Sequence, residues 1–337
     1  MLHVTTATPS AQMQLPLCNH PLRFGSKLAR LQQFTTFVLV VTAVAGAAHL
    51  ASRGQPLWAF ATFTLVIGGH AVFLAFEFLL LARANRDDAA PAATARDLAG
   101  AWWGEVLAAT QVFCWQQPFR SHAQPDDVSP ATGGGAVGIV FVHGFVCNRG
   151  LWNPWLKRLR QLGVPFVAVN LEPVFGSIDN YAPIIEQAVR RVEAATAARP
   201  LIVAHSMGGL AVRAWLDAWR ADARVHHVIT IGTPHRGTLL ARFAFTPNVV
   251  QMRRDSRWLH DLEAREPGGR YASFTCFFSH CDNIVFPAST ATLPGAQNRH
   301  VRGAAHVRLA RDEIVFREVL RHAGAAAPPL HQRNGIG

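Results

Sequence analysis

A serine, an acid and a histidine follow apolar runs of this 337-residue chain in an order that could support nucleophilic catalysis. Ser206 lies in AHSMGG, Asp282 in SHCDNIVFP and His306 in RGAAHVRL. A serine hydroxyl is a weak nucleophile until a base removes its proton, and that base is commonly a histidine oriented by a carboxylate. We therefore predict Ser206 as the nucleophile, His306 as the base and Asp282 as the residue that orients His306.

The neighbours of Ser206 suit a sharp turn between a strand and a helix. Such a turn needs small residues two positions before and two positions after the serine, and Ala204 and Gly208 occupy these positions. Glycine is the usual residue at the first of them, and alanine is the smallest departure from it. The six letters alone also fit an ordinary serine, so the prediction depends on the acid and the histidine downstream.

Two backbone N–H groups are predicted to stabilise the oxyanion of a tetrahedral intermediate. The first belongs to Met207, which follows the nucleophile at the start of a helix. The second belongs to Phe145, in the loop His143-Gly144-Phe145 after an apolar run. Glycine at position 144 permits the tight backbone course that directs the Phe145 N–H inward.

Other residues compete for these roles. His300 falls within an expected strand, and His235 precedes the acid in the chain, so both fit the base less well than His306. His205 is expected to pack behind the turn. Asp261 and Glu263 are the distant alternatives to Asp282.

Apolar strands alternate with helical stretches from residue 137 onward, which is typical of a parallel α/β sheet with helices on both faces. In such sheets, sites lie at the carboxyl ends of the strands. Helices are expected at 180–197, 208–219 and 306–322. The expected strands are 138–143, 166–170, 201–204, 225–231, 273–278 and 298–302.

Two apolar spans, 34–50 and 57–82, precede this region and predict a transmembrane helical hairpin at 34–82. A cleaved secretory signal is the alternative for the first span. Glu77, the one acid of the second span, is expected at headgroup level near the helix end. Basic residues flank the hairpin, whereas Arg53 stands alone in its turn, which favours an inner-membrane protein of a bacterium with the large domain in the cytoplasm.

The remaining segments follow from composition. Residues 1–33 read as a basic tail, 83–136 as a linker with an amphipathic Trp-rich helix, 137–323 as the catalytic domain and 324–337 as a disordered tail. The Trp-rich stretch 98–115 suits a membrane interface or packing on the domain equally well. Residues 239–270 are arginine-rich and read as a cap over the site or as a surface excursion.

The net charge of +11 favours an anionic lipid surface over nucleic acid, because no nucleic-acid-binding motif accompanies it. Five scattered cysteines, Cys276 and Cys281 among them, read as free thiols rather than a disulfide framework. The histidines lack metal-ligand spacing. We predict no cofactor and no metal, and the sequence leaves the oligomeric state open.

The chain resembles the α/β-hydrolases of the bacterial lipase and esterase type over residues 137–322. The motifs that carry the resemblance are VHGF at 142–145, NLEPVFGSIDNYAP at 170–183, AHSMGG at 204–209, GTPHRGT at 232–238, CDNIV at 281–285 and GAAH at 303–306. The resemblance implies hydrolysis of carboxylic esters through an acyl-enzyme, with lipids or other acyl esters as substrates, and a structural role for His235. An acyltransferase with the same acyl-enzyme and a non-catalytic membrane scaffold are the alternatives, and a transporter component is disfavoured.

Overall fold

The computed structural model describes residues 26–129 and 137–326. Most of the predicted basic tail, Cys18 included, and most of the predicted C-terminal tail lie outside the described residues.

Six parallel strands form one sheet in the order β2-β1-β3-β4-β5-β6. All six predicted strands are present, and their ends lie within two residues of the prediction. Five of the six strands are almost wholly buried, which is why their sequences read as continuous apolar runs. The strands are β1 (Ile139–Val142), β2 (Phe166–Ala168), β3 (Leu201–His205), β4 (His227–Ile231), β5 (Phe274–Phe278) and β6 (Gln297–His300).

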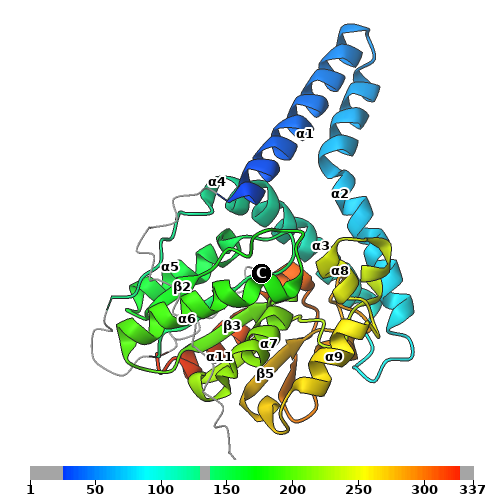
Figure 1. The fold of residues 1–337 in the computed structure, drawn as a ribbon. Helices are drawn as coiled ribbons and strands as arrows, with labels where there is room; N and C mark the ends of the chain where they lie inside the picture. Colours follow the sequence, from blue (N-terminus) through cyan, green and yellow to red (C-terminus); the bar gives the residue numbers. More distant parts are fainter. Residues whose placement is uncertain (1–25, 130–136, 327–337) are drawn as a thin grey trace, which may run out of the picture.

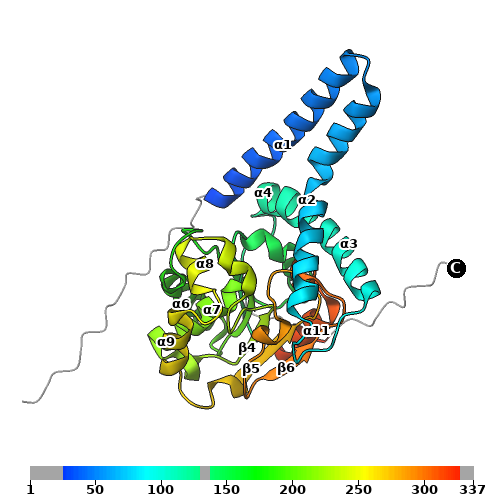
Figure 2. The ribbon, with the colours of Figure 1, turned by 90° about the vertical axis from the view of Figure 1, so that its right-hand side faces the viewer.

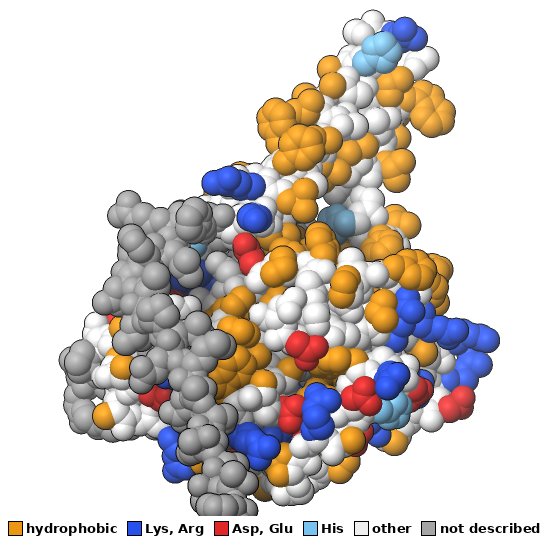
Figure 3. All heavy atoms as spheres, in the orientation of Figure 1, with side chains coloured by type: hydrophobic (Ala, Val, Ile, Leu, Met, Phe, Trp, Pro, Cys, Tyr) orange, Lys and Arg blue, Asp and Glu red, His pale blue; other side chains and the backbone are white. Residues whose placement is uncertain are grey.

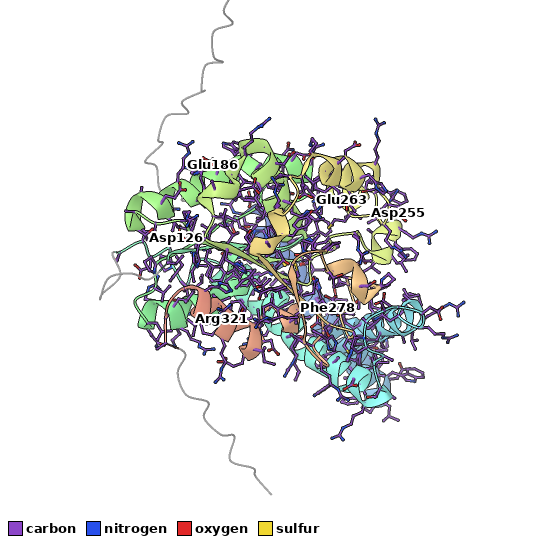
Figure 4. All side chains as sticks on the ribbon, turned by 90° about the horizontal axis from the view of Figure 1, so that it is seen from below. Asp126, Glu186, Asp255, Glu263, Phe278 and Arg321 are labelled. Carbon is purple, nitrogen blue, oxygen red and sulfur yellow. The ribbon has the colours of Figure 1, made fainter. Side chains whose placement is uncertain are left out.

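Helices cover both faces of the sheet, because alternate strand residues point to opposite sides. Val140 and Val142 pack in one core with α6 (Ala182–Thr196) and α7 (Met207–Trp219). Ile139 and Phe141 pack in a second core on the other face, with α5 (Asn153–Gln161), α10 (His306–Leu309) and α11 (Glu313–His322). Figure 4 shows Glu186 of α6 and Arg321 of α11 on opposite sides of the sheet.

Two long apolar helices, α1 (Lys27–Ser52) and α2 (Pro56–Ala84), form a hairpin that extends away from the sheet and its helices (Figures 1 and 2). Both have the length and composition to cross a membrane, with mean hydropathies of 1.8 and 2.1. Figure 3 shows hydrophobic side chains along the whole hairpin and basic side chains near its tip and its base.

The base of the hairpin packs on the α/β domain. Leu28 and Gln32 near the start of α1 are buried, and the Gln32 Nε2 donates to the Gln117 side chain at 2.8 Å. Glu77 and Leu81 near the end of α2 are buried as well. The prediction of a headgroup-level acid at position 77 is therefore wrong, because its carboxylate packs inside the protein.

The predicted Trp-rich helix is α3 (Ala95–Gln111), which continues through a π-helical turn (Val112–Gln116) into the short α4 (Gln117–Arg120). Trp102 packs against α2 and donates its indole N–H to the Ala71 carbonyl at 2.9 Å. Trp103 and Trp115 are more than half exposed. One side of this segment is therefore packed on protein, and the other is open.

The arginine-rich segment 239–270 contains α8 (Pro247–Gln251) and α9 (Arg257–Arg265). Asn248 donates to the Val174 carbonyl at 2.8 Å, so α8 is fastened to the loop before α6. Of the aromatic residues before α8, Phe243 and Phe245 are 72% and 81% exposed. They point outward, whereas Met252 after α8 is buried.

The single helix predicted at 306–322 is two helices, α10 and α11, with a break at residues 310–312. Asp312 is the reason, because its carboxylate accepts the Ile314 N–H at 2.8 Å and caps the start of α11. Its backbone is extended, with φ −71° and ψ 139°, which a continuous helix excludes.

Replacement of Asp312 by alanine should lower the free energy of unfolding by about 1 kcal/mol, because the Ile314 N–H loses its acceptor. Chemical denaturation of the detergent-solubilised protein measures this change. Asp312→Asn keeps a capping oxygen and is the matched control; an equal loss in both variants would contradict the role of the cap.

Candidate active site

Ser206 lies between the end of β3 and the start of α7 in a strained backbone conformation, with φ 56° and ψ −131°. This region is costly for a residue with a side chain, so the surrounding structure must hold it. Part of that support is the Ser206 N–H, which donates to the Ile231 carbonyl of β4 at 2.8 Å. A Cβ on Gly208 would lie 2.6 Å from the His143 carbonyl oxygen, so the turn needs glycine there. Ala204 is fully buried beneath it.

Asp282 and His306 form a buried hydrogen-bonded pair. Both carboxylate oxygens of Asp282 lie 2.9 Å from Nδ1 of His306. The same carboxylate accepts the N–H groups of Ile284 and Val285 at 3.0 and 2.8 Å, which fixes its orientation. His306 therefore donates from Nδ1, and the lone pair of Nε2 stays available to accept a proton.

The electrostatic surroundings make His306 a stronger base than a free imidazole. Burial alone lowers the pKa of a histidine. The charge and hydrogen bond of Asp282, with the charges of Glu105 and Glu77, outweigh burial and raise the pKa of His306 above its ordinary value. A base with a raised pKa accepts the serine proton more readily.

Close contacts bring the three predicted catalytic residues, which follow β3, β5 and β6, into one cluster at the carboxyl edge of the sheet. A Cβ on Gly232, the residue after β4, would lie 2.7 Å from Asp282 Oδ2 and 3.3 Å from His306 Nδ1. The ring of His205, which precedes Ser206, lies 4.5 Å from the His306 ring between centroids. Parallel strands that end at one edge place these residues together.

The loop after β1 completes the cluster. A Cβ on Gly144 would lie 3.3 Å from Ser206 Oγ. His143 Nδ1 donates to the Gly144 carbonyl at 2.8 Å, and its Nε2 accepts the Leu171 N–H at 2.9 Å. Burial lowers the pKa of His143 to about 4, so this ring is neutral and can do both. Because the C=O and N–H of a trans peptide point in opposite directions, the Phe145 N–H points away from His143.

The two predicted oxyanion donors have no acceptor within the described residues: neither the Phe145 N–H nor the Met207 N–H donates to a protein group there. Unpaired donors next to a nucleophile are the arrangement that an oxyanion requires.

The competing residues make other contacts. His205 is buried and donates from Nε2 to the His306 carbonyl at 3.2 Å. His235 contacts Thr230 Oγ1 at 3.0 Å. His300, at the end of β6, packs against the ring of His280. Asp261 and Glu263 are exposed on α9.

Three further residues contact the cluster, and the sequence did not single them out as site residues. Asn283 accepts the His306 N–H at 3.2 Å through its Oδ1. Glu105 of α3 accepts the N–H groups of Val307 and Arg308, and Glu77 of α2 accepts from Asn283. The one available signal was an acid within a largely apolar helix.

Within the described residues, no group of three or more His, Cys, Asp or Glu side chains is placed to hold a metal ion. The cysteines at 114, 147, 276 and 281 are free thiols.

The alpha/beta hydrolase family model matches residues 139–331. The chain belongs to the α/β-hydrolase family. The match spans more than half of the chain and includes Ser206, Asp282 and His306. It begins after the hairpin, α3 and α4, so these segments of the hydrolase lie outside the family match.

Two solved lipase structures are similar to this hydrolase at low sequence identity, and the first of them shares its fold. The mature form of a Bacillus licheniformis lipase has a TM-score of 0.51 and 17% identity, over 58% of this chain and 96% of the lipase. Lipase B of Aspergillus fumigatus has a TM-score of 0.48 and 19% identity, over 55% of this chain and 53% of the lipase. No curated protein matches the sequence.

The reaction of Ser206 with a fluorophosphonate should slow as the pH falls, with a midpoint above 6.5, the ordinary pKa of histidine. His306 accepts the serine proton only when it is neutral, and Asp282 stabilises the protonated form. Labelling rates measured from pH 5 to pH 10 test this expectation.

Asp282→Asn removes the charge that stabilises the imidazolium, so it should move the midpoint to lower pH and slow the labelling. A wild-type midpoint at or below 6.5 would show that the Asp282–His306 pair does not govern Ser206.

Proposed function

We propose that this protein is a membrane-anchored serine hydrolase that cleaves carboxylic esters, with lipids as the substrate class. The observation that carries the proposal is the single cluster of a strained serine, a buried Asp–His pair and two unpaired N–H groups. Each of these parts has a cost to the folded protein, and together they meet the requirements of acyl transfer through a serine.

In the first half-reaction, Ser206 Oγ attacks the ester carbonyl carbon while His306 Nε2 takes the hydroxyl proton. The carbonyl oxygen becomes negative and accepts from the N–H groups of Phe145 and Met207. Loss of one such donor typically raises the barrier by about 2.7 to 4 kcal/mol. Collapse of the intermediate breaks the bond to the alcohol, which leaves with the proton of His306, and an acyl ester of Ser206 remains.

In the second half-reaction, water replaces the alcohol. His306 accepts a proton from the water as its oxygen attacks the acyl carbon, and the same two N–H groups hold the oxyanion. The proton then returns to Ser206 as the carboxylic acid leaves. Asp282 keeps Nδ1 of His306 protonated throughout, so Nε2 alone exchanges the proton.

Apolar surface near the site favours acyl chains. Phe145, which would supply an oxyanion donor, packs its ring 5.9 Å from that of Phe175, which is half-exposed. The apolar hairpin would hold the domain at the bilayer that contains such substrates.

A panel of carboxylic esters of increasing acyl length tests the activity, with the wild type compared against Ser206→Ala and His306→Ala. Each variant should lose ~10³-fold or more of kcat/KM, because nucleophile and base act as a unit. Glu263→Gln on the exposed α9 is the matched control and should keep wild-type activity.

Equal hydrolysis by the wild type and both active-site variants would contradict the proposal. Glycerol added in competition with water identifies acyl transfer, because that reaction yields a new ester in place of the free acid. A wild type that neither hydrolyses esters nor reacts with a fluorophosphonate would favour a non-catalytic scaffold.

The proposed orientation places both ends of the hairpin and the catalytic domain in the cytoplasm. Lys27, Arg30, Arg83 and Arg86 lie at the domain end, whereas Arg53 lies alone at the tip. A reporter that is active only outside the cytoplasm should be active when inserted at Gly54 and inactive when fused after residue 326. The reverse pattern would overturn the orientation.

A further inference from the structure

Two buried glutamates from helices outside the family match contact the backbone that carries His306. Glu77 lies on α2 and Glu105 on α3, and their side chains are 4% and 1% exposed. Figures 1 and 2 both show the lower part of α2 and the helix α3 beside the C-terminal part of the domain. A buried carboxylate is costly unless hydrogen bonds stabilise it, so the partners of these two groups are informative.

Glu105 holds the start of α10 with both carboxylate oxygens. Its Oε1 accepts the Val307 N–H at 2.8 Å, and its Oε2 accepts the Arg308 N–H at 3.1 Å. The first N–H groups of a helix have no partner inside the helix, so the Glu105 carboxylate supplies acceptors that the Val307 and Arg308 N–H groups would otherwise lack. His306 is the first residue of α10, so Glu105 fixes the peptides directly after the proposed base.

Glu77 acts on the same backbone from the other side of His306. Its Oε2 accepts from Asn283 Nδ2 at 2.6 Å, and Asn283 Oδ1 accepts the His306 N–H at 3.2 Å. Asn283 directly follows Asp282. Asn283 therefore links the loop that carries Asp282 to the His306 backbone and to α2. Its contact on α2 is the carboxylate of Glu77.

The groups that face His306 have opposite effects on its charge. Asp282, Glu105 and Glu77 favour the imidazolium, in that order. His205, 4.5 Å away between ring centroids, is buried and neutral, since burial holds its pKa well below the ordinary value. Burial raises the pKa of Glu105 to about 7, so above that pH its charge strengthens His306 as a base, and loss of the charge would weaken it.

The arginines closest in sequence to the contacts of the two glutamates bind or pack against other groups. Arg302 pairs with Asp97 at the start of α3 at 3.0 Å. The Arg308 side chain packs beside Gly104, where a Cβ would lie 3.1 Å from its Cδ. Within the described residues, no arginine or lysine forms an ion pair with Glu77 or Glu105. Instead, backbone N–H groups bind both oxygens of Glu105, and the Asn283 amide binds one oxygen of Glu77.

We propose that Glu77 and Glu105 are positioning residues that hold His306 and Asn283 in register with Asp282, and that α2 and α3 are therefore parts of the active site. The inference rests on the proposed function. It means that the segment matched by the family model lacks two groups on which the geometry of the proposed base depends, and that the hairpin does more than tether the domain.

The experiment uses the full-length protein in detergent micelles, with each glutamate changed to glutamine and to leucine. Glutamine removes the charge and keeps an acceptor oxygen, whereas leucine removes both. Glu263→Gln is the control, since Figure 4 shows Glu263 on the α9 side, away from α2 and α3. The readouts are kcat, KM, the pH profile, the rate of fluorophosphonate labelling of Ser206, and the thermal unfolding midpoint.

The leucine variants should lose of the order of 10- to 100-fold in kcat with little change in KM, because a base displaced by a fraction of an ångström no longer meets the serine proton. Glu77→Gln should recover most of kcat, because Glu77 accepts with one oxygen. Glu105→Gln should recover only part of it, because one of its two accepting oxygens becomes an NH2 group that faces a backbone N–H. In both variants the acid limb of the profile moves to lower pH. Glu263→Gln should match the wild type in all readouts.

Glutamine and leucine variants with wild-type kcat and an unmoved acid limb would overturn the inference. The inference would also be overturned if the glutamine variants lost kcat only together with a lower unfolding midpoint and without a shift of the acid limb. That pattern indicates a structural role alone. If a leucine variant does not fold, the acid limb of the pH profile of the matching glutamine variant tests the inference.

Failure of the proposed function gives a different result. Wild-type protein that labels at Ser206 but turns over no ester would refute ester hydrolysis, and the pH dependence of labelling in the glutamine variants would still decide the positioning roles. Wild-type protein that does not label would overturn both, because His306 would then activate no nucleophile.

Discussion

The hydrogen-bonded pair of Asp282 and His306 is the interaction on which the rest of the site depends. Both partners are almost fully buried, so the carboxylate must be satisfied by protein groups, and it is: by the imidazole and by two backbone N–H groups of its own loop. This arrangement selects the Nδ1–H tautomer, raises the pKa of the imidazole and leaves Nε2 without a proton. In the proposed mechanism, Ser206 without this pair would carry an ordinary hydroxyl.

The parallel sheet makes the pair useful, because it brings three loops to one edge. β1, β3 and β4 are in register, with Val142 opposite Ala204 and His205 opposite Ile231. The loop after β1, the turn at Ser206 and Gly232 therefore follow one another along the edge. The backbone strain at Ser206 is held by this pairing and by close contacts that only glycine permits at 144, 208 and 232. The central strands and their loops therefore share in holding the strained backbone at Ser206.

The N-terminal helices contact the site from both ends of the hairpin. Gln32 of α1 donates to the Val146 carbonyl at 3.5 Å, next to the oxyanion loop, while α2 reaches Asn283 through Glu77. α3 contacts the start of α10 through Glu105, which accepts the Val307 N–H. A hairpin that only tethered the domain would need none of these buried polar contacts, and each would be costly if left unpaired. The proposed anchor and the proposed catalytic groups therefore form one structural unit.

The sequence alone determined the strands, the apolar hairpin and the candidates Ser206, Asp282, His306, Phe145 and Met207. These features rest on local patterns: apolar periodicity, small residues around a turn, and the order of three residue types. It missed the helix α5 and the break at Asp312, where capping by one side chain outweighs helical periodicity. It also misread Glu77, because the partner of a buried carboxylate 206 positions away has no signature in local sequence. Only the tertiary structure decided which acids contact His306, since such contacts depend on how helices distant in sequence pack against one sheet edge.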